Sequence, residues 1–140
     1  MNKTKSYSSQ ISLWILLAIG LWGGVSVSYE TLIGVSACPN IIGLPICYLV
    51  TIGYSLMLMS QLISLFDSHN ILTPKLFYAG WGVVFAIAAM GVSFELLLTD
   101  VCPKSASGLP LCYVSFGLCI LILVFYRLHL HYKVSLPSKP

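Results

Sequence analysis

Residues 76–98 read LFYAGWGVVFAIAAMGVSFELLL and contain a single charged side chain, Glu95, in 23 positions. A helix needs about 20 apolar residues to cross roughly 30 Å of hydrocarbon at 1.5 Å per residue. The stretch meets that length, and it lacks the regular alternation of apolar and polar residues that marks a membrane barrel strand. Since lipid offers no partner to an unpaired backbone group, only a helix allows this stretch to cross a membrane.

Three more apolar stretches contain no Lys or Arg: residues 11–35, 46–66 and 111–126. The first two are long enough to span a membrane, and the last becomes so if it continues to His131. We therefore predict an all-α integral membrane protein, a single membrane domain in which four transmembrane helices form a bundle.

The composition of the whole chain supports this class. Of the 140 residues, 58% are hydrophobic and 8% are charged, whereas a soluble domain usually has about 25% charged residues. The formal net charge is only +3, and the basic residues form no stripe that could follow nucleic-acid phosphates. These values exclude an ordinary cytosolic enzyme, a disordered tail and a nucleic-acid-binding protein.

The basic residues predict the orientation of the bundle. Lys and Arg beside transmembrane helices stay in the cytoplasm. Only Lys104 falls in a loop on the opposite side from the other six, which are Lys3, Lys5, Lys75, Arg127, Lys133 and Lys139. We predict that residues 1–10 and 132–140 are cytoplasmic tails and that connections 36–45 and 99–110 are periplasmic or extracellular. The membrane is then a bacterial inner membrane or a plasma membrane.

The first apolar stretch also has an alternative interpretation as a signal peptide. Lys3 and Lys5 precede it, and Val35-Ser36-Ala37-Cys38 resembles a lipoprotein cleavage box. Residues 11–35 are long for the core of a signal peptide, however, so we expect an uncleaved transmembrane helix.

Each half of the chain carries the pattern S-[YF]-E…C-P…G-L-P-[IL]-C-Y. The first copy runs from Ser28 to Tyr48 and the second from Ser93 to Tyr113. Each copy joins a helix, an outer loop and a second helix, so both copies have the same orientation. We predict two tandem parallel two-helix repeats, about residues 11–66 and 76–131, related by a pseudo-twofold axis along the membrane normal.

Four of the five cysteines, namely Cys38, Cys47, Cys102 and Cys112, belong to this repeat and fall in the outer loops. An oxidising compartment allows disulfides there. Three connectivities are possible, and the repeat favours Cys38–Cys47 and Cys102–Cys112. Each bond would stabilise the fold by roughly 2–3 kcal/mol. The close C-x-x-C spacing of structural zinc sites is missing, so we expect no metal, and we expect Cys119 to be a packing residue.

Glu30 and Glu95 form a second pair, each about two helical turns before its loop cysteine. A carboxyl group at that depth usually faces the bundle interior, a cavity or a partner. If the two meet, one should hold a proton, and the pair could be a proton-linked or cation-binding site. The alternative is a tether that accepts hydrogen bonds from loop N–H groups or from Tyr48 and Tyr113, and we favour it.

Glycines are concentrated in the first and third apolar stretches. Small residues let transmembrane helices approach closely. We therefore expect close helix contacts at Gly20, Gly23, Gly24, Gly80 and Gly82.

The segment Gly43–Tyr54, GLPICYLVTIGY, resembles the loop-to-helix segment of bacterial vitamin K epoxide reductase homologues. Those proteins, like the quinone-linked disulfide-forming membrane oxidoreductases, are four-helix bundles with paired loop cysteines outside the membrane. The resemblance implies that Cys38 and Cys47 correspond to a shuttle pair and that quinone is the cofactor. The C-x-x-C pair on which that family's activity depends has no counterpart in this sequence.

Three functions are compatible with these features. We favour a small non-enzymatic membrane protein with disulfide-stapled outer loops, acting as a subunit or binding partner in a membrane complex, because the sequence contains no catalytic motif. Its expected partners are membrane lipid and other membrane subunits or a second copy, without cofactor or nucleic acid. The second is a thiol–disulfide oxidoreductase of the vitamin K epoxide reductase type. The third is a small-solute or ion transporter, a homodimer using Glu30 and Glu95.

Overall fold

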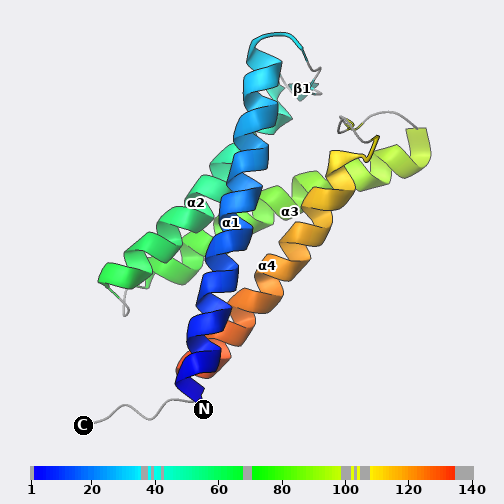
Figure 1. Ribbon diagram of the computed structural model, residues 1–140. Coiled ribbons are helices and arrows are strands. Elements are labelled where there is room, and N and C mark those ends of the chain that lie inside the picture. Colours follow the sequence, from blue (N-terminus) through cyan, green and yellow to red (C-terminus); the bar gives the residue numbers. More distant parts are fainter. Residues whose placement is uncertain are drawn as a thin grey trace.

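In a computed structural model of the chain, the described residues form four long helices and one short hairpin: α1 (Asn2–Leu32), β1 (Asn40–Ile41), β2 (Leu44–Pro45), α2 (Ile46–Phe66), α3 (Leu72–Leu98) and α4 (Leu111–Val134) (Figure 1). The structure describes residues 2–35, 38, 40–41, 43–67, 71–98, 102, 104 and 108–134. Every helix is long and apolar enough to cross a membrane, over Tyr7–Leu32, Ile46–Phe66, Leu72–Leu97 and Leu111–His131. The predicted all-α chain with four potential transmembrane helices is confirmed.

The helix boundaries agree with the predicted ones at α2 and differ elsewhere. Helix α1 begins at Asn2 rather than Ile11, and α4 continues to Val134, beyond both Tyr126 and the longer limit at His131. All residues of the two predicted tails, 1–10 and 132–140, are therefore either helical or outside the described residues. Apolar composition marks the part of a helix suited to lipid, whereas backbone hydrogen bonding can continue through the polar residues beyond it.

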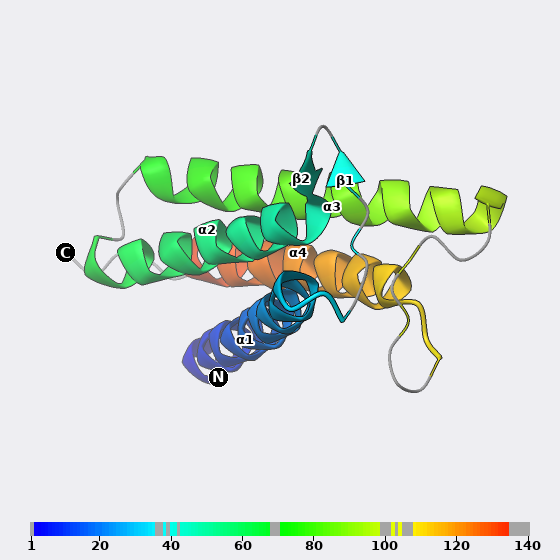
Figure 2. The ribbon, with the colours of Figure 1, turned by 90° about the horizontal axis from the view of Figure 1, so that it is seen from above.

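Each helix packs on two neighbours: α1 and α3 both pack against α2 and against α4. Figures 1 and 2 show α2, α3 and α4 running alongside one another with α1 leaning across them. The two cysteine loops leave the same end of the bundle, which we call the cysteine end. The opposite end holds the start of α1, the α2–α3 connection and the end of α4, and we call it the tail end.

The core lies where the four helices meet. The side chains that form it are Leu13, Leu17, Tyr54, Met57, Phe77, Val84, Cys119, Ile122 and Tyr126. Phe77 stacks on Tyr126 with ring centroids 3.7 Å apart, which joins α3 to α4. Cys119 is fully buried, so the prediction that it is a packing residue is confirmed.

Glycines let three pairs of helix segments approach closely. A Cβ atom on Gly80 would lie 2.5 Å from the carbonyl oxygen of Gly53, so α2 and α3 touch backbone to backbone. On α1, a Cβ on Gly20 would overlap the ring of Tyr54, and one on Gly24 would lie 3.0 Å from a side-chain oxygen of α2. The predicted close contacts at Gly20, Gly24 and Gly80 are confirmed.

Two of the predicted glycine contacts are wrong. A Cβ atom on Gly23 or on Gly82 would have no atom within 4 Å among the described residues. Glycine content identifies a helix that can approach another closely, but the rotation of the helix decides which of its glycines face a neighbour.

Polar side chains also join the helices inside the bundle. Examples are hydrogen bonds donated to backbone carbonyls of a neighbouring helix by Ser60 to Thr73 (2.7 Å), by Ser9 to Phe125 (3.2 Å) and by Trp81 to Cys119 (3.0 Å). Such bonds are a usual means of association between helices in lipid. They hold α2 to α3, α1 to α4 and α3 to α4.

Candidate functional site

The first cysteine loop is closed by a disulfide between Cys38 and Cys47. Between them β1 and β2 pair as an antiparallel hairpin, in which Ile41 lies opposite Leu44. Gly43 in the turn has a φ of 80°, a conformation that favours glycine. The backbone N–H of Cys47 donates to the sulfur of Cys38 over 3.1 Å. The loop is thus pinned at the second residue of α2.

A buried serine on α1 fixes this loop to the bundle. The Ser28 hydroxyl lies 2.9 Å from the Thr51 hydroxyl and 3.3 Å from the carbonyl oxygen of Cys47. Thr51 also donates to that carbonyl oxygen, over 3.0 Å. The first turns of α2, and with them the disulfide, are therefore held against α1 through Ser28.

The second cysteine loop is closed by a disulfide between Cys102 and Cys112. Cys102 is only 6% exposed, and its sulfur lies 3.6 Å from the carbonyl oxygen of Gly91. A Cβ atom on Gly91 would lie 2.8 Å from the sulfur of Cys112. This disulfide therefore rests directly on the backbone of α3, at a position that only glycine leaves open.

Glu95 fixes the second loop to α3. Its carboxylate is half-buried and accepts a hydrogen bond from the backbone N–H of Cys102 over 2.9 Å. A charged acceptor makes this a stronger bond than one between neutral groups. In this copy of the repeat the glutamate is a tether to a loop N–H group.

Glu30 is placed differently from Glu95. It is exposed on α1, and no described residue donates a hydrogen bond to its carboxylate. The ends of α1 and α3 at the cysteine end diverge in both views (Figures 1 and 2), so the structure does not bring the two carboxylates together. Tyr48 is half-buried and Tyr113 is 41% exposed. Neither hydroxyl makes a hydrogen bond within the described part of the chain.

One face of α1 carries large exposed apolar side chains at intervals of three or four residues: Ile11, Ile15, Ile19, Trp22, Val25 and Tyr29. Trp22 is 77% exposed. It lies ten residues before Leu32, so it is about 15 Å from the end of the helix and near the middle of the potential span. Tryptophan that anchors a protein at the membrane surface lies at the ends of spans instead.

The repeat relates part of this exposed face of α1 to a covered part of α3. Glu30 and Glu95 are 65 positions apart, and the same offset aligns Ile19 with Val84 and Gly23 with Ala88. Val84 and Ala88 are buried and Glu95 is half-buried, whereas all three aligned residues of α1 are exposed. Toward the cysteine end the two helices agree, because Val25 and Tyr29 align with Met90 and Phe94, which are exposed as well. We call these three, Ile19, Gly23 and Glu30, together with Trp22, the open face of α1.

Several residues of this site were not identified from the sequence alone. Gly91 was not among the glycines expected at close contacts, and neither Ser28 nor Thr51 was expected to anchor a loop. The repeated S-[YF]-E pattern contains the signal that identifies Ser28, because a polar residue that recurs within an apolar helix indicates a hydrogen bond to another element.

Comparisons of the chain with sequence models of protein families, with curated proteins and with solved structures found no match. The resemblance of Gly43–Tyr54 to vitamin K epoxide reductase homologues therefore stays a prediction.

Proposed function

We propose that the protein is a non-enzymatic membrane protein that binds a partner membrane protein through the open face of α1. In this proposal the four helices cross a bacterial inner membrane or a plasma membrane as two tandem repeats. Both termini are cytoplasmic, and the stapled loops lie outside. The exposure of Trp22 at mid-span, beside Ile19 and Gly23, whose aligned residues in α3 are buried, is the observation that supports it most.

The chemistry of the open face suits a protein better than lipid. Glu30 is exposed on this face, two residues before the end of the potential span, where its carboxylate is an acceptor for a hydrogen-bond donor of a partner helix. Trp is among the residues that dominate binding energy at protein interfaces. Gly23, with open space above it, would let the backbone of another helix approach closely. The partner is therefore a transmembrane helix with a hydrogen-bond donor near its outer end, opposite Glu30.

The two loops support a structural role for the cysteines. Each pair is closed within its own loop, and each loop is tied to a helix by a separate polar side chain, Ser28 or Glu95. Most disulfides of outer loops are structural. In this proposal the loops keep the cysteine ends of α1 and α2, and of α3 and α4, in register while α1 presents its open face.

Photo-cross-linking from the open face tests the proposal. A photoreactive amino acid replaces Trp22, and in a matched control it replaces Leu121, which is 48% exposed near the middle of α4. Irradiation of cells should give one discrete protein adduct from position 22 and only lipid adducts from position 121. The Glu30→Leu exchange should weaken the adduct from position 22, because the partner loses its charged acceptor.

Two results would contradict the proposal. Lipid adducts alone from position 22, matching those from position 121, would mean that the open face is simply lipid-facing. Equal adducts from both positions would mean that the cross-linking reports crowding in the membrane rather than a specific contact.

The oxidoreductase is the second candidate, and one observation favours it. Cys47 is the second residue of α2, and a helix N-terminus stabilises the thiolate that attacks a disulfide. Cys38 and Cys47 are both half-buried, whereas Cys102 is buried, so a catalytic pair would be Cys38–Cys47. Transport through a Glu30–Glu95 pair has less support, because Glu95 is bonded to its own loop and Glu30 lies on an exposed face.

A further inference from the structure

Most of the buried polar side chains lie toward the tail end of the bundle. Among the described residues five polar side chains are buried, and only Ser28 lies toward the cysteine end. The other four come from the start of α1, the end of α2 and the start of α3: Ser9, Ser60, Gln61 and Thr73. We call these four side chains the tail layer. The interior of the bundle is therefore most polar next to the tail end.

Only two members of the tail layer form hydrogen bonds within the bundle. The Ser60 hydroxyl donates to the carbonyl oxygen of Thr73, and the Ser9 hydroxyl donates to that of Phe125. The Thr73 hydroxyl, in contrast, is buried without a hydrogen-bond partner among the described residues. Gln61 is only 4% exposed, and no described residue makes a hydrogen bond with its side-chain amide. A buried polar group without a partner is costly, so a bound partner would stabilise both groups.

Gln61 and Thr73 face the interior of the bundle. Gln61 lies one turn after Met57, which is fully buried in the core. Thr73 lies one turn before Phe77, which is also fully buried and stacks on Tyr126 of α4. Both polar side chains therefore lie directly beyond the apolar core, on its tail side.

The tail layer is also close to the ends of the potential spans. Gln61 lies five residues before Phe66, the last residue of its span, which is about 7.5 Å along the helix axis. Thr73 is the second residue of the span that begins at Leu72. The two groups that lack a partner are thus within a short distance of the solvent beyond the helix ends.

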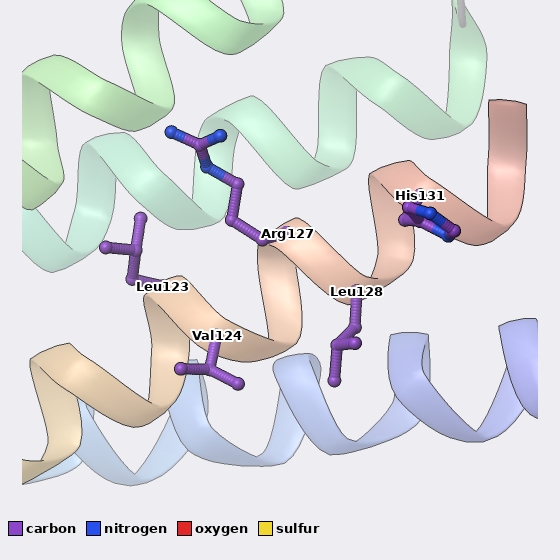
Figure 3. A pocket seen from close by; sticks show the side chains of 5 residues that line it. All are labelled: Leu123, Val124, Arg127, Leu128 and His131. Atoms are coloured by element: carbon purple, nitrogen blue, oxygen red, sulfur yellow. The ribbon is translucent and has the colours of Figure 1, made fainter.

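The charged side chains of α4 at this end lie outside the bundle interior. Arg127 and His131 are exposed and line a hollow on the surface of α4 together with Leu123, Val124 and Leu128. Figure 3 shows the Arg127 side chain extending from α4 on the side opposite Val124 and Leu128. The four members of the tail layer are all uncharged. A neutral ligand that both donates and accepts hydrogen bonds therefore suits this layer better than an anion or a cation.

We propose that the tail layer binds internal water, which forms hydrogen bonds with the Gln61 amide and the Thr73 hydroxyl. A buried water molecule typically makes about three hydrogen bonds to polar groups that otherwise lack partners, and both of these groups can donate and accept. The bound water links α2 to α3 beside the direct bond from Ser60 to Thr73. This site does not depend on the partner of the open face, so a failed cross-link at Trp22 would leave it unaffected.

Thermal unfolding of the full chain in detergent tests the site through the sign of one shift. Thr73→Val keeps the shape of the side chain and removes its hydroxyl. If the hydroxyl binds water, the variant loses that interaction and should melt about 2–4 °C below wild type. Thr31→Val is the matched control and should have a smaller effect, because the Thr31 hydroxyl donates to Val27 in its own helix. An unchanged or higher melting temperature in Thr73→Val would overturn the proposal, because the lost hydroxyl would then have been an unpaired buried group.

Nuclear magnetic resonance of the wild-type chain in detergent micelles detects the water directly. Cross-relaxation from water should reach the γ-methylene protons of Gln61 but not the methyl group of Met57, one turn deeper on the same helix. The signal at Gln61 should weaken in Thr73→Val, which lacks the second polar partner. A wild-type spectrum without the Gln61 signal would mean that the layer is dry, and equal signals at Gln61 and Met57 would mean that water enters the whole bundle. Either result would overturn the proposal.

Discussion

The two cysteine loops share one sequence pattern, but different members of that pattern anchor them. In the first loop the serine of S-[YF]-E is used: Ser28 is buried and contacts the first turns of α2. In the second loop the glutamate is used: Glu95 accepts the N–H of Cys102. The unused members, Glu30 and Ser93, are both exposed, and the Ser93 hydroxyl donates to Ala89 in its own helix.

The rotation of the helices explains this difference. A serine and a glutamate two residues apart point about 200° apart around a helix, so only one of them can face a neighbouring element. Helix α1 turns Ser28 inward, where Thr51 supplies a second hydroxyl. The residue of α4 aligned with Thr51 is Phe116, which offers Ser93 no such partner. The repeated sequence therefore specifies a disulfide in both loops, but it does not specify which side chain fixes each loop to the bundle.

Removing the disulfides should have the largest effect and should differ between the loops. Replacing Cys102 and Cys112 together by serine should lower the free energy of unfolding by about 2–4 kcal/mol, because it also leaves the packing against Gly91 incomplete. Replacing Cys38 and Cys47 should cost less, because both are only half-buried. Thermal unfolding in detergent measures both variants. A larger loss from the first loop would contradict the idea that the second loop is the more tightly packed.

Gly91→Ala should destabilise the protein by about 1–3 kcal/mol, the usual effect of overpacking. The new methyl group would meet the sulfur of Cys112 at 2.8 Å. Gly82→Ala is the matched control on the same helix, since a Cβ there meets no described atom within 4 Å. Its effect should stay within about 0.5 kcal/mol. Equal melting temperatures for the two variants would show that the disulfide does not rest on α3.

Glu95→Leu should lower stability by about 1–3 kcal/mol because it leaves the Cys102 N–H without its acceptor. Glu95→Gln keeps an oxygen acceptor and should be affected less. Glu30→Leu, in the isolated protein, should change stability by no more than about 0.5 kcal/mol. Chemical unfolding followed by tryptophan fluorescence measures all three variants. If Glu30→Leu were as destabilising as Glu95→Leu, the two glutamates would have the same role after all.

Ser28→Ala should show the smallest of these effects, about 1 kcal/mol for the loss of its hydrogen bonds to α2. Ser93→Ala should be nearly neutral, because Ser93 is exposed and bonds only within its own helix. Hydrogen exchange of the Thr51 backbone amide gives a local measure of the same anchor. Faster exchange in Ser93→Ala than in Ser28→Ala would reverse the assignment of anchors.

The sequence predicted the features that depend on composition and spacing. Long apolar stretches without Lys or Arg predicted four helices, and the boundaries of α2 were predicted to the residue. The repeated cysteines predicted the two disulfides, because each loop is short enough to close on itself. The burial of Cys119 followed from its place within an apolar helix.

The features that depend on helix rotation could not be predicted in this way. The apolar residues of α1 are distributed all around it, so the sequence does not show that Leu13 and Leu17 face inward while Ile15 and Ile19 face outward. For the same reason the repeat suggested equal roles for Glu30 and Glu95, which the structure places in different surroundings. The ends of α1 and α4 depend on backbone hydrogen bonding in polar segments, which hydropathy does not report.

The reduction potential of the two cysteine pairs tests most directly whether this is a stapled, non-enzymatic protein. The purified chain is equilibrated in glutathione buffers of defined potential, trapped by alkylation and mapped by mass spectrometry. Structural disulfides usually have potentials below about −300 mV, so we expect both pairs to remain closed at about −250 mV, each within its own loop. Half-reduction of Cys38–Cys47 near −200 mV, the range of catalytic pairs, would contradict the account and favour the oxidoreductase.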